Sequence, residues 1–160
     1  MSLNELSGVL WRERQLLELL LFKLEEEQLV LTSGRTRWLG HATREVESVL
    51  EQIRTAELGR AVEADAAARE LGVPEGSSLS VLAASAPAPW DDLLREHHEA
   101  FVSLTDEIKS LAESNRDLLA TSHRAAQETL MSLQDTVQTY DPRGTASSAT
   151  GSVQLLDQAL

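Results

Sequence analysis

The chain has 160 residues, no cysteine and a formal net charge of −12 at pH 7. Its length predicts a single domain with a substantial core. The acidic balance argues against nucleic acid and anionic membrane surfaces as partners, because both repel a negatively charged protein. The lack of cysteine excludes a disulfide framework and a thiolate site, which fits a reducing cytoplasm.

Leucine and alanine supply most of the apolar side chains, whereas aromatic residues make up only 4% of the chain. This composition favours helices, since strands prefer β-branched and aromatic side chains. No apolar run approaches the roughly 20 residues that span a bilayer. The apolar stretch 16–22 is short and lies between Arg14 and Lys23, with no small-residue cleavage site after it, so it is not predicted to be a signal peptide.

The first predicted helix covers about residues 3–31. Ser2 and Glu5 match a capping box, in which each side chain can bond the backbone N–H of the other residue. Additional apolar residues at 16, 19, 21 and 22 widen the apolar face, so two neighbouring helices are expected to bury it. Gly34 suits the left-handed cap that ends the helix. The leucine stripe, with gaps at Glu13 and Glu27, consists of Leu3, Leu6, Leu10, Leu17, Leu20, Leu24 and Leu31.

The second predicted helix covers about residues 36–71, with apolar side chains again in steps of three and four. Its second half, from Ala61 to Leu71, is rich in alanine and has few large side chains. Gly72 and Pro74 end it. The following segment, 72–88, is predicted as a loop rich in Ser, Ala and Pro, with a short helix from Ser78 to Ala84.

The third predicted helix covers about residues 89–138, where Pro89 suits the first turn and Asp91 suits the positive end of the helix dipole. Its apolar stripe follows alternating steps of four and three and then slips by one residue, which rotates the stripe by about 100°. The first part contains Trp90, Leu94, His97, Phe101, Leu104, Ile108, Leu111, Asn115, Leu118, Ser122 and Ala125, and the second Ala126, Leu130, Leu133 and Val137.

At 1.5 Å per residue the three helices span roughly 43, 54 and 75 Å. The sequence therefore predicts an all-α fold, an elongated antiparallel three-helix bundle or coiled coil of residues 1–140, in which the third helix overhangs its partners. A kink or fraying near Ser122 is the alternative. Residues 141–160 are predicted to form a flexible, disordered tail, because they carry too little apolar surface to offset the entropy of ordering.

The sequence contains no arrangement of residues that predicts catalysis, a metal or another cofactor. His97 and His98 are adjacent and point about 100° apart on a helix, so they cannot share a metal ion. His98 and Glu99 lack the second histidine of a zinc protease motif. Histidines in solvent or at an interface edge are the expectation, and the acidic run 25–27 is interpreted as a solvated helix face.

Asn115 lies on the apolar seam of the third helix. A buried amide at such a position costs stability but can fix the register of packed helices. A polar residue tolerated at the edge of the bundle is the equally weighted alternative.

At Asn115-Arg-Asp-Leu118-Leu119 the chain resembles the FlgN family of flagellar export chaperones. Those proteins are similar in size, acidity and three-helix layout. The segment Tyr140-Asp-Pro-Arg-Gly144 is similar to a family element beyond the last long helix, and Phe22 to Leu29 resembles the family's opening helix. The family's glutamine-rich later turns are replaced here by Ala125-Ala126-Gln127.

The resemblance implies a cytoplasmic chaperone that escorts hook–filament junction (hook-associated) proteins to the flagellar export gate. It implies that substrate binds the C-terminal part of the third helix, the segment that the length argument also left uncovered. The expected mechanism is the packing of an apolar helix face against a substrate helix. Tyr140 is assigned by resemblance to the export gate. The predicted partner-binding residues are Asn115, Leu118, Leu119, Leu130, Met131, Leu133, Val137 and Tyr140.

Two other functions fit parts of the sequence. A generic coiled-coil adaptor or structural protein explains the heptads equally well. A secreted helical hairpin of the Trp-x-Gly class matches Trp38-Leu39-Gly40, although that class places the motif in the turn, predicted here at Gly34. An exposed apolar stripe is also compatible with a homodimer.

Overall fold

In a computed structural model of the chain, residues 2–139 are described, whereas Met1 and residues 140–160 lie outside the described part. The predicted flexible tail, 141–160, therefore falls wholly outside the described residues. The chain divides into two compact units, Met1–Glu113 and Ser114–Leu160. Each unit is considered by itself.

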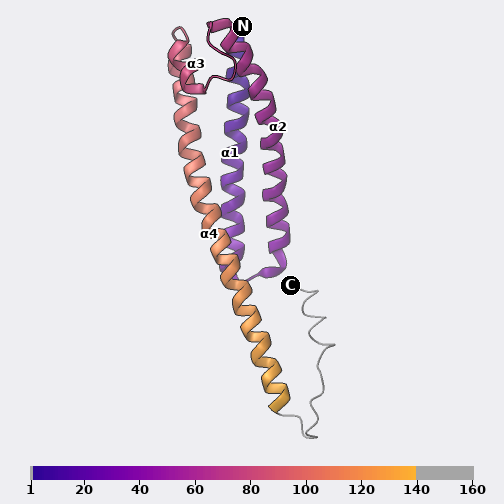
Figure 1. Cartoon of the computed structure of the whole chain (residues 1–160). Helices are drawn as coiled ribbons and strands as arrows, with labels where there is room; N and C mark the ends of the chain where they lie inside the picture. Colours follow the sequence, from indigo (N-terminus) through magenta and orange to yellow (C-terminus); the bar gives the residue numbers. More distant parts are fainter. Residues whose placement is uncertain (1, 140–160) are drawn as a thin grey trace. The chain divides into compact units, whose positions relative to one another are not determined.

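The described residues form helices and no strand (Figure 1). The elements are α1 (Ser2–Ser33), the short 3-10 helix η1 (Thr36–Trp38), α2 (Leu39–Leu71), α3 (Leu79–Ser85) and α4 (Trp90–Thr139). The all-α helical bundle predicted from apolar periodicity is confirmed. The short helix expected near 78–84 is α3, whose first turn is capped where the Val81 N–H donates to the Ser78 hydroxyl.

α4 continues through Ser122 as one helix. It has 50 residues, against 32 in α1 and 33 in α2. At 1.5 Å per residue it is longer than either by about 25 Å. The predicted overhang concerns the placement of the second unit against the first and stays a prediction.

The two ends of the α1–α2 pair are joined by polar contacts that define its antiparallel direction. The Lys23 ammonium donates to the Glu45 carboxylate at 3.0 Å, in the second half of α1 and the first half of α2. At the opposite end, the backbone N–H and the hydroxyl of Ser2 both donate to the Glu70 carboxylate. The prediction of a capping box with Glu5 was therefore wrong, because the backbone N–H of Ser2 donates to Glu70 of the neighbouring helix and not to Glu5.

The two helix ends assigned to glycine have the expected geometry. Gly34 after α1 and Gly72 after α2 both have φ of +71°. Glycine adopts this left-handed conformation without the steric penalty that a Cβ brings. Between α1 and α2 the chain forms η1, so Trp38 precedes α2, and only Leu39 and Gly40 of the Trp-x-Gly tripeptide lie inside it. The predicted second helix, 36–71, included the whole tripeptide, and this was wrong for Trp38.

Two apolar clusters form the core of the first unit. The first contains Leu3, Leu6, Leu10, Ala67, Ala68, Leu82, Ala83 and Leu94, and the second contains Leu20, Leu24, Val46, Val49 and Ile53. The alanine-rich half of α2 belongs to the first cluster, where Ala67 and Ala68 are buried together with Leu82 of α3. The small side chains of α2 thus leave room for an additional helix.

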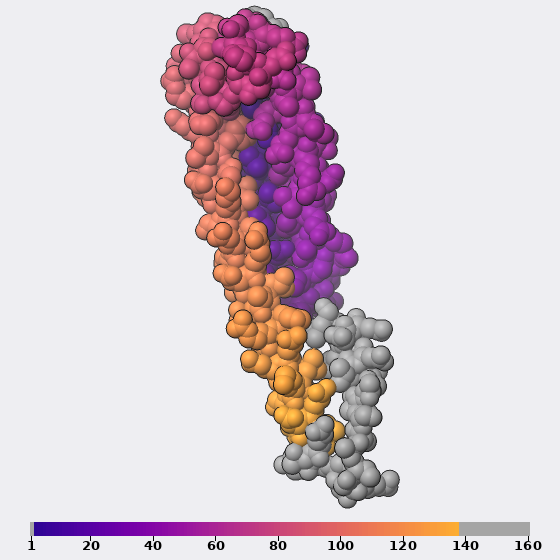
Figure 2. Space-filling view, viewed as in Figure 1, coloured from indigo at the N-terminus to yellow at the C-terminus, as the bar shows by residue number. Residues whose placement is uncertain are grey.

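The first part of α4 runs in the same direction as α1. Leu94 packs in the cluster at the N-terminal end of α1, whereas Ile108 and Leu111 pack against the cluster that contains Leu20 and Leu24. In the first unit α1 consequently has two long neighbours, as its wide apolar face predicted. On the face shown in Figure 2, α1 is visible only as a narrow strip between them.

Shortening the core leucines of α1 should destabilise the first unit strongly. Leu20 is 4% exposed and Leu17 packs against the same cluster. Core Leu→Ala changes cost about 2–5 kcal/mol each. We expect the double variant Leu17→Ala, Leu20→Ala to lower the free energy of unfolding by several kcal/mol, measured by urea denaturation.

The matched control for this change is Leu29→Ala in the same helix. Leu29 is 70% exposed, so its truncation removes little buried area. Its effect should stay within about 0.5 kcal/mol. Equal losses in the two proteins would contradict the assignment of Leu20 to the core.

Candidate functional site

In the second unit, the described residues are the helical segment from Ser114 to Thr139. Asn115 is buried, at 4% exposed, which favours the buried amide over a polar residue tolerated at an edge. Leu118 and Leu130 are half-buried. Four predicted partner-binding residues are exposed, namely Leu119 (48%), Met131 (65%), Leu133 (54%) and Val137 (53%). Tyr140 lies outside the described residues.

Helical geometry groups four of these residues on one side of α4. Val137 follows Leu119 by about five full turns, so the two side chains leave the helix in the same direction. Leu130 and Leu133 deviate from that direction by only about 20° and 40°. We call these four residues, Leu119, Leu130, Leu133 and Val137, the Leu119 face.

The other two apolar candidates point elsewhere. Met131 lies about 120° from Leu119 around the helix, and Leu118 lies about 100° away in the opposite sense. Leu118 instead continues the stripe that includes Leu111. The six apolar residues predicted to form a single face are thus divided by the helix geometry, and Met131 provides an exposed apolar residue outside the Leu119 face.

Small side chains occupy the middle of the Leu119 face. Ser122 and Ala126 lie on this side of the helix between Leu119 and Leu130. Side chains of this size allow a second helix to approach closely while the larger residues on either side contact it. Two threonine hydroxyls of the same segment are already used, since Thr129 and Thr136 each donate to a carbonyl of their own helix at 2.9 Å.

One of the four histidines contradicts the expectation that they lie in solvent or at an interface edge. His97 is 1% exposed, and its two ring nitrogens have no hydrogen-bond partner among the described residues. Its ring meets Trp11 edge-on, with centroids 4.9 Å apart, and stacks with Phe101 at 6.3 Å. Burial lowers the pKa of His97, and the positive charge of Arg14 lowers it further. His97 therefore belongs to the core as a neutral aromatic ring.

Glu13, a gap in the leucine stripe of α1, is also buried. It is 3% exposed and pairs with Arg60 of α2 at 3.3 Å. Burial raises the pKa of Glu13, while the Arg60 charge opposes that shift. The burial of Glu13 could have been predicted from the sequence. Glu13 stands three residues after Leu10 and four before Leu17, which is a buried position of the leucine stripe.

Neither buried group belongs to a reactive cluster. Within residues 2–139, no three His, Cys, Asp or Glu side chains come together in a way that could hold a metal ion. The helices of this part of the chain contain no stretch long and apolar enough to cross a membrane. The feature of the second unit that most resembles a functional site is the Leu119 face.

The family model described as FlgN protein matches residues 1–148, nearly the whole chain. The chain therefore belongs to the FlgN family of flagellar export chaperones. No curated protein and no solved structure gives a significant match. The resemblance noted at Asn115, Leu118 and Leu119 is confirmed at the level of the family.

The buried His97 should make the protein sensitive to mild acid. Its pKa in the folded state lies below the ordinary value of 6.5, so the unfolded chain binds the proton first as the pH falls. The stability that the neutral ring contributes is fully present above the unfolded-state pKa. It is then lost progressively as the pH drops through 6.5 towards the lower pKa of the folded state.

The comparison protein is His97→Phe, which keeps an aromatic ring and removes the titration. Urea denaturation at several pH values between neutral and about pH 5 should show a smaller loss of stability in this variant. Glu13 acts in the opposite direction, since its raised pKa favours the folded state at low pH, but it contributes equally to both proteins. Parallel pH profiles for the two proteins would contradict the assigned role of His97.

Proposed function

We propose that this protein is a cytoplasmic chaperone that binds hook–filament junction proteins through the Leu119 face of α4 and delivers them to the flagellar export gate. Membership of the FlgN family supports the role of an export chaperone. The observation that carries the choice of binding site is the exposure of three of the four residues of the Leu119 face, from 48% to 54%.

An exposed stripe of this kind fits a helix as ligand. Leu119, Leu130, Leu133 and Val137 recur along one side of α4, so a helix lying alongside could contact them in successive turns. Hydrophobic contact would also keep an aggregation-prone substrate segment away from water. Exposed charged residues on the opposite side of α4, among them Asp117, Arg124 and Glu128, would keep the free chaperone soluble.

Tyr140 is proposed as a contact with the export gate. It follows α4 directly and lies within the residues matched by the family model, which extends to residue 148. Tyr140 is not one of the residues of the Leu119 face. Replacing Tyr140 therefore offers a way to disturb delivery without disturbing substrate capture.

The alternatives to this proposal are a structural coiled coil, a homodimer and a secreted hairpin. In a structural coiled coil or a homodimer the Leu119 face would pair with a second copy of the chain, and substrate would not compete for it. Family membership disfavours a secreted hairpin of the Trp-x-Gly class, although Trp38 does lie in the turn region.

Truncating two residues of the Leu119 face should weaken substrate binding and leave the fold intact. The variant is Leu130→Ala, Leu133→Ala. Interface anchors commonly contribute about 1–2 kcal/mol or more each, so the pair should lower affinity by at least roughly tenfold. Alanine is a good helix former, so α4 is not weakened. Co-purification with the hook–filament junction proteins measures binding, and a melting curve measures stability.

Met131→Ala is the matched control, because Met131 is even more exposed, at 65%, yet points away from the Leu119 face. It should retain substrate binding. If Leu130→Ala, Leu133→Ala melts far lower and still binds substrate, these side chains belong to the core. If Met131→Ala loses binding equally, the assignment of the contact to one side of α4 is wrong.

A further inference from the structure

The turn between α1 and α2 carries a concentration of positive charge in an otherwise acidic chain. From Gln28 to Arg44 there is no Asp or Glu, although the chain has 26 of them. The same stretch contains Arg35, Arg37 and Arg44, and all three side chains are exposed. We call these three arginines together with Trp38 and His41 the turn patch. It lies entirely within the first unit.

The aromatic residue of the turn patch is held in place between polar neighbours. Trp38 is 45% exposed. The Arg37 guanidinium carbon lies over its ring at 4.5 Å from the centroid, and the His41 ring lies 5.7 Å from it. The Arg44 guanidinium in turn donates to Nδ1 of His41 at 3.3 Å. A large apolar surface and two oriented guanidinium groups are therefore presented together before any partner arrives.

The backbone beneath the turn patch is also fixed by local contacts. The Trp38 N–H donates to the Arg35 carbonyl at 3.2 Å, and the Arg35 N–H donates to the Ser33 hydroxyl at 3.2 Å. Gly34 provides the left-handed conformation at the end of α1. The patch is thus part of an ordered turn, which reduces the entropy lost on binding.

The three arginines of the turn patch form no ion pair within the described residues. Of the flanking carboxylates, Glu27 accepts a hydrogen bond from Thr43, and Glu45 pairs with Lys23 and also interacts electrostatically with His41. Exposed arginine and tryptophan are the residue types most enriched where binding energy concentrates in interfaces.

We propose that the turn patch is a second docking surface, which binds an acidic segment of a partner protein. Charge complementarity identifies the occupant. The basic residues of the patch are all arginine or histidine, and the planar guanidinium fork binds carboxylates in a bidentate manner, unlike the lysine ammonium. Trp38 would pack against an apolar side chain within that acidic segment. This surface is additional to the Leu119 face and does not depend on its role.

An anionic membrane is disfavoured as the occupant of the turn patch. A membrane presents a broad sheet of negative charge, which would also face the acidic surfaces of α1 and α2, in a chain of net charge −12. A short peptide instead interacts mainly with charges within about 8 Å at physiological ionic strength, where the arginines dominate.

The probe is a fluorescein-labelled peptide of about a dozen residues, composed of Asp, Glu and Gly around a central Phe. Its neutral counterpart carries Asn and Gln. Fluorescence anisotropy with the full chain measures binding. We expect the acidic peptide to bind and the neutral one to bind much more weakly. Arg35→Gln, Arg37→Gln should weaken binding by about tenfold or more, as should Trp38→Ala.

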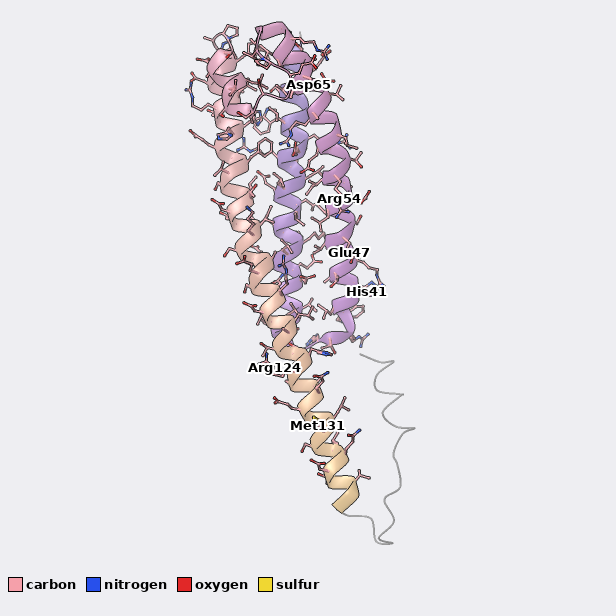
Figure 3. All side chains as sticks on the ribbon, viewed as in Figure 1. His41, Glu47, Arg54, Asp65, Arg124 and Met131 are labelled. Atoms are coloured by element: carbon pink, nitrogen blue, oxygen red, sulfur yellow. The ribbon has the colours of Figure 1, made fainter. Side chains whose placement is uncertain are left out.

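The matched control is Arg54→Gln, Arg95→Gln, which removes the same charge from two other exposed arginines of the first unit. Figure 3 labels Arg54 further along α2 than His41, the residue of the turn patch labelled there. Circular dichroism melts should be unchanged in both variants. The control should alter peptide affinity by less than about twofold, because scattered surface charges contribute little.

Several results would overturn the proposal. If Arg54→Gln, Arg95→Gln lost as much peptide affinity as Arg35→Gln, Arg37→Gln, peptide binding would reflect the net charge of the protein and not the turn patch. Failure of the acidic peptide to bind, or equal binding of the neutral peptide, would exclude charge recognition at this surface. Binding of phosphatidylserine vesicles without peptide binding would identify a lipid surface. A dimer that dissociates only in the Arg35→Gln, Arg37→Gln variant, without peptide binding, would identify a second copy as the occupant.

Capture of hook–filament junction proteins provides an independent readout. The turn patch variants should capture these substrates as the unaltered protein does, since the Leu119 face is unchanged. Loss of peptide binding together with loss of substrate capture would contradict the separation of the two surfaces. Failure of the proposed chaperone function would leave the peptide result unaffected.

Discussion

The burial of the leucine stripe of α1 is the constraint on which the first unit depends. Leu3, Leu6, Leu10, Leu20 and Leu24 are each at most 5% exposed, and one neighbouring helix could not cover them all. α2 and the first part of α4 therefore pack on the same helix. Both bring apolar residues to the two clusters, so loss of α1 would remove the partner that they share.

Polar groups lie along α1 between the two apolar clusters. Glu13 pairs with Arg60, and His97 is enclosed by Trp11 and Phe101. Burying a charge or an unpaired imidazole costs stability relative to an apolar side chain of the same size. Such groups also disfavour a helix shifted along α1, because a shift would separate Glu13 from Arg60. This gives the polar residues a role in the register of the bundle, with no need for catalysis.

The two proposed interaction surfaces use different physical chemistry. The Leu119 face is apolar and follows one side of a helix, so it suits a substrate helix and would bind through hydrophobic contact. The turn patch combines Trp38 with arginine side chains and would choose its partner by charge. An escort that must hold one protein and contact another needs surfaces that do not compete, and these two lie in separate units.

The sequence by itself determined the helices, since their causes are local. The steps of three and four, Gly34, Gly72 and Pro74 all act within a few residues, and the helix boundaries agree with them closely. The Leu119 face could likewise be derived from the sequence, because once α4 is a continuous helix its angular positions follow from the period. The same period places Met131 outside the Leu119 face, and its predicted role in partner binding stays a prediction.

Only the tertiary structure decided which polar residues became buried and which residue capped which helix end. His97 and Glu13 stand at stripe positions, but a stripe position does not say whether a neighbour covers it. That depends on residues far away in sequence, such as Arg60. For the same reason, Ser2 bonds Glu70 of the neighbouring helix and not Glu5 of its own helix. The alanines of α2 are buried because α3 packs on them. Burial is a property of the assembled helices, and it cannot be derived from one helix alone.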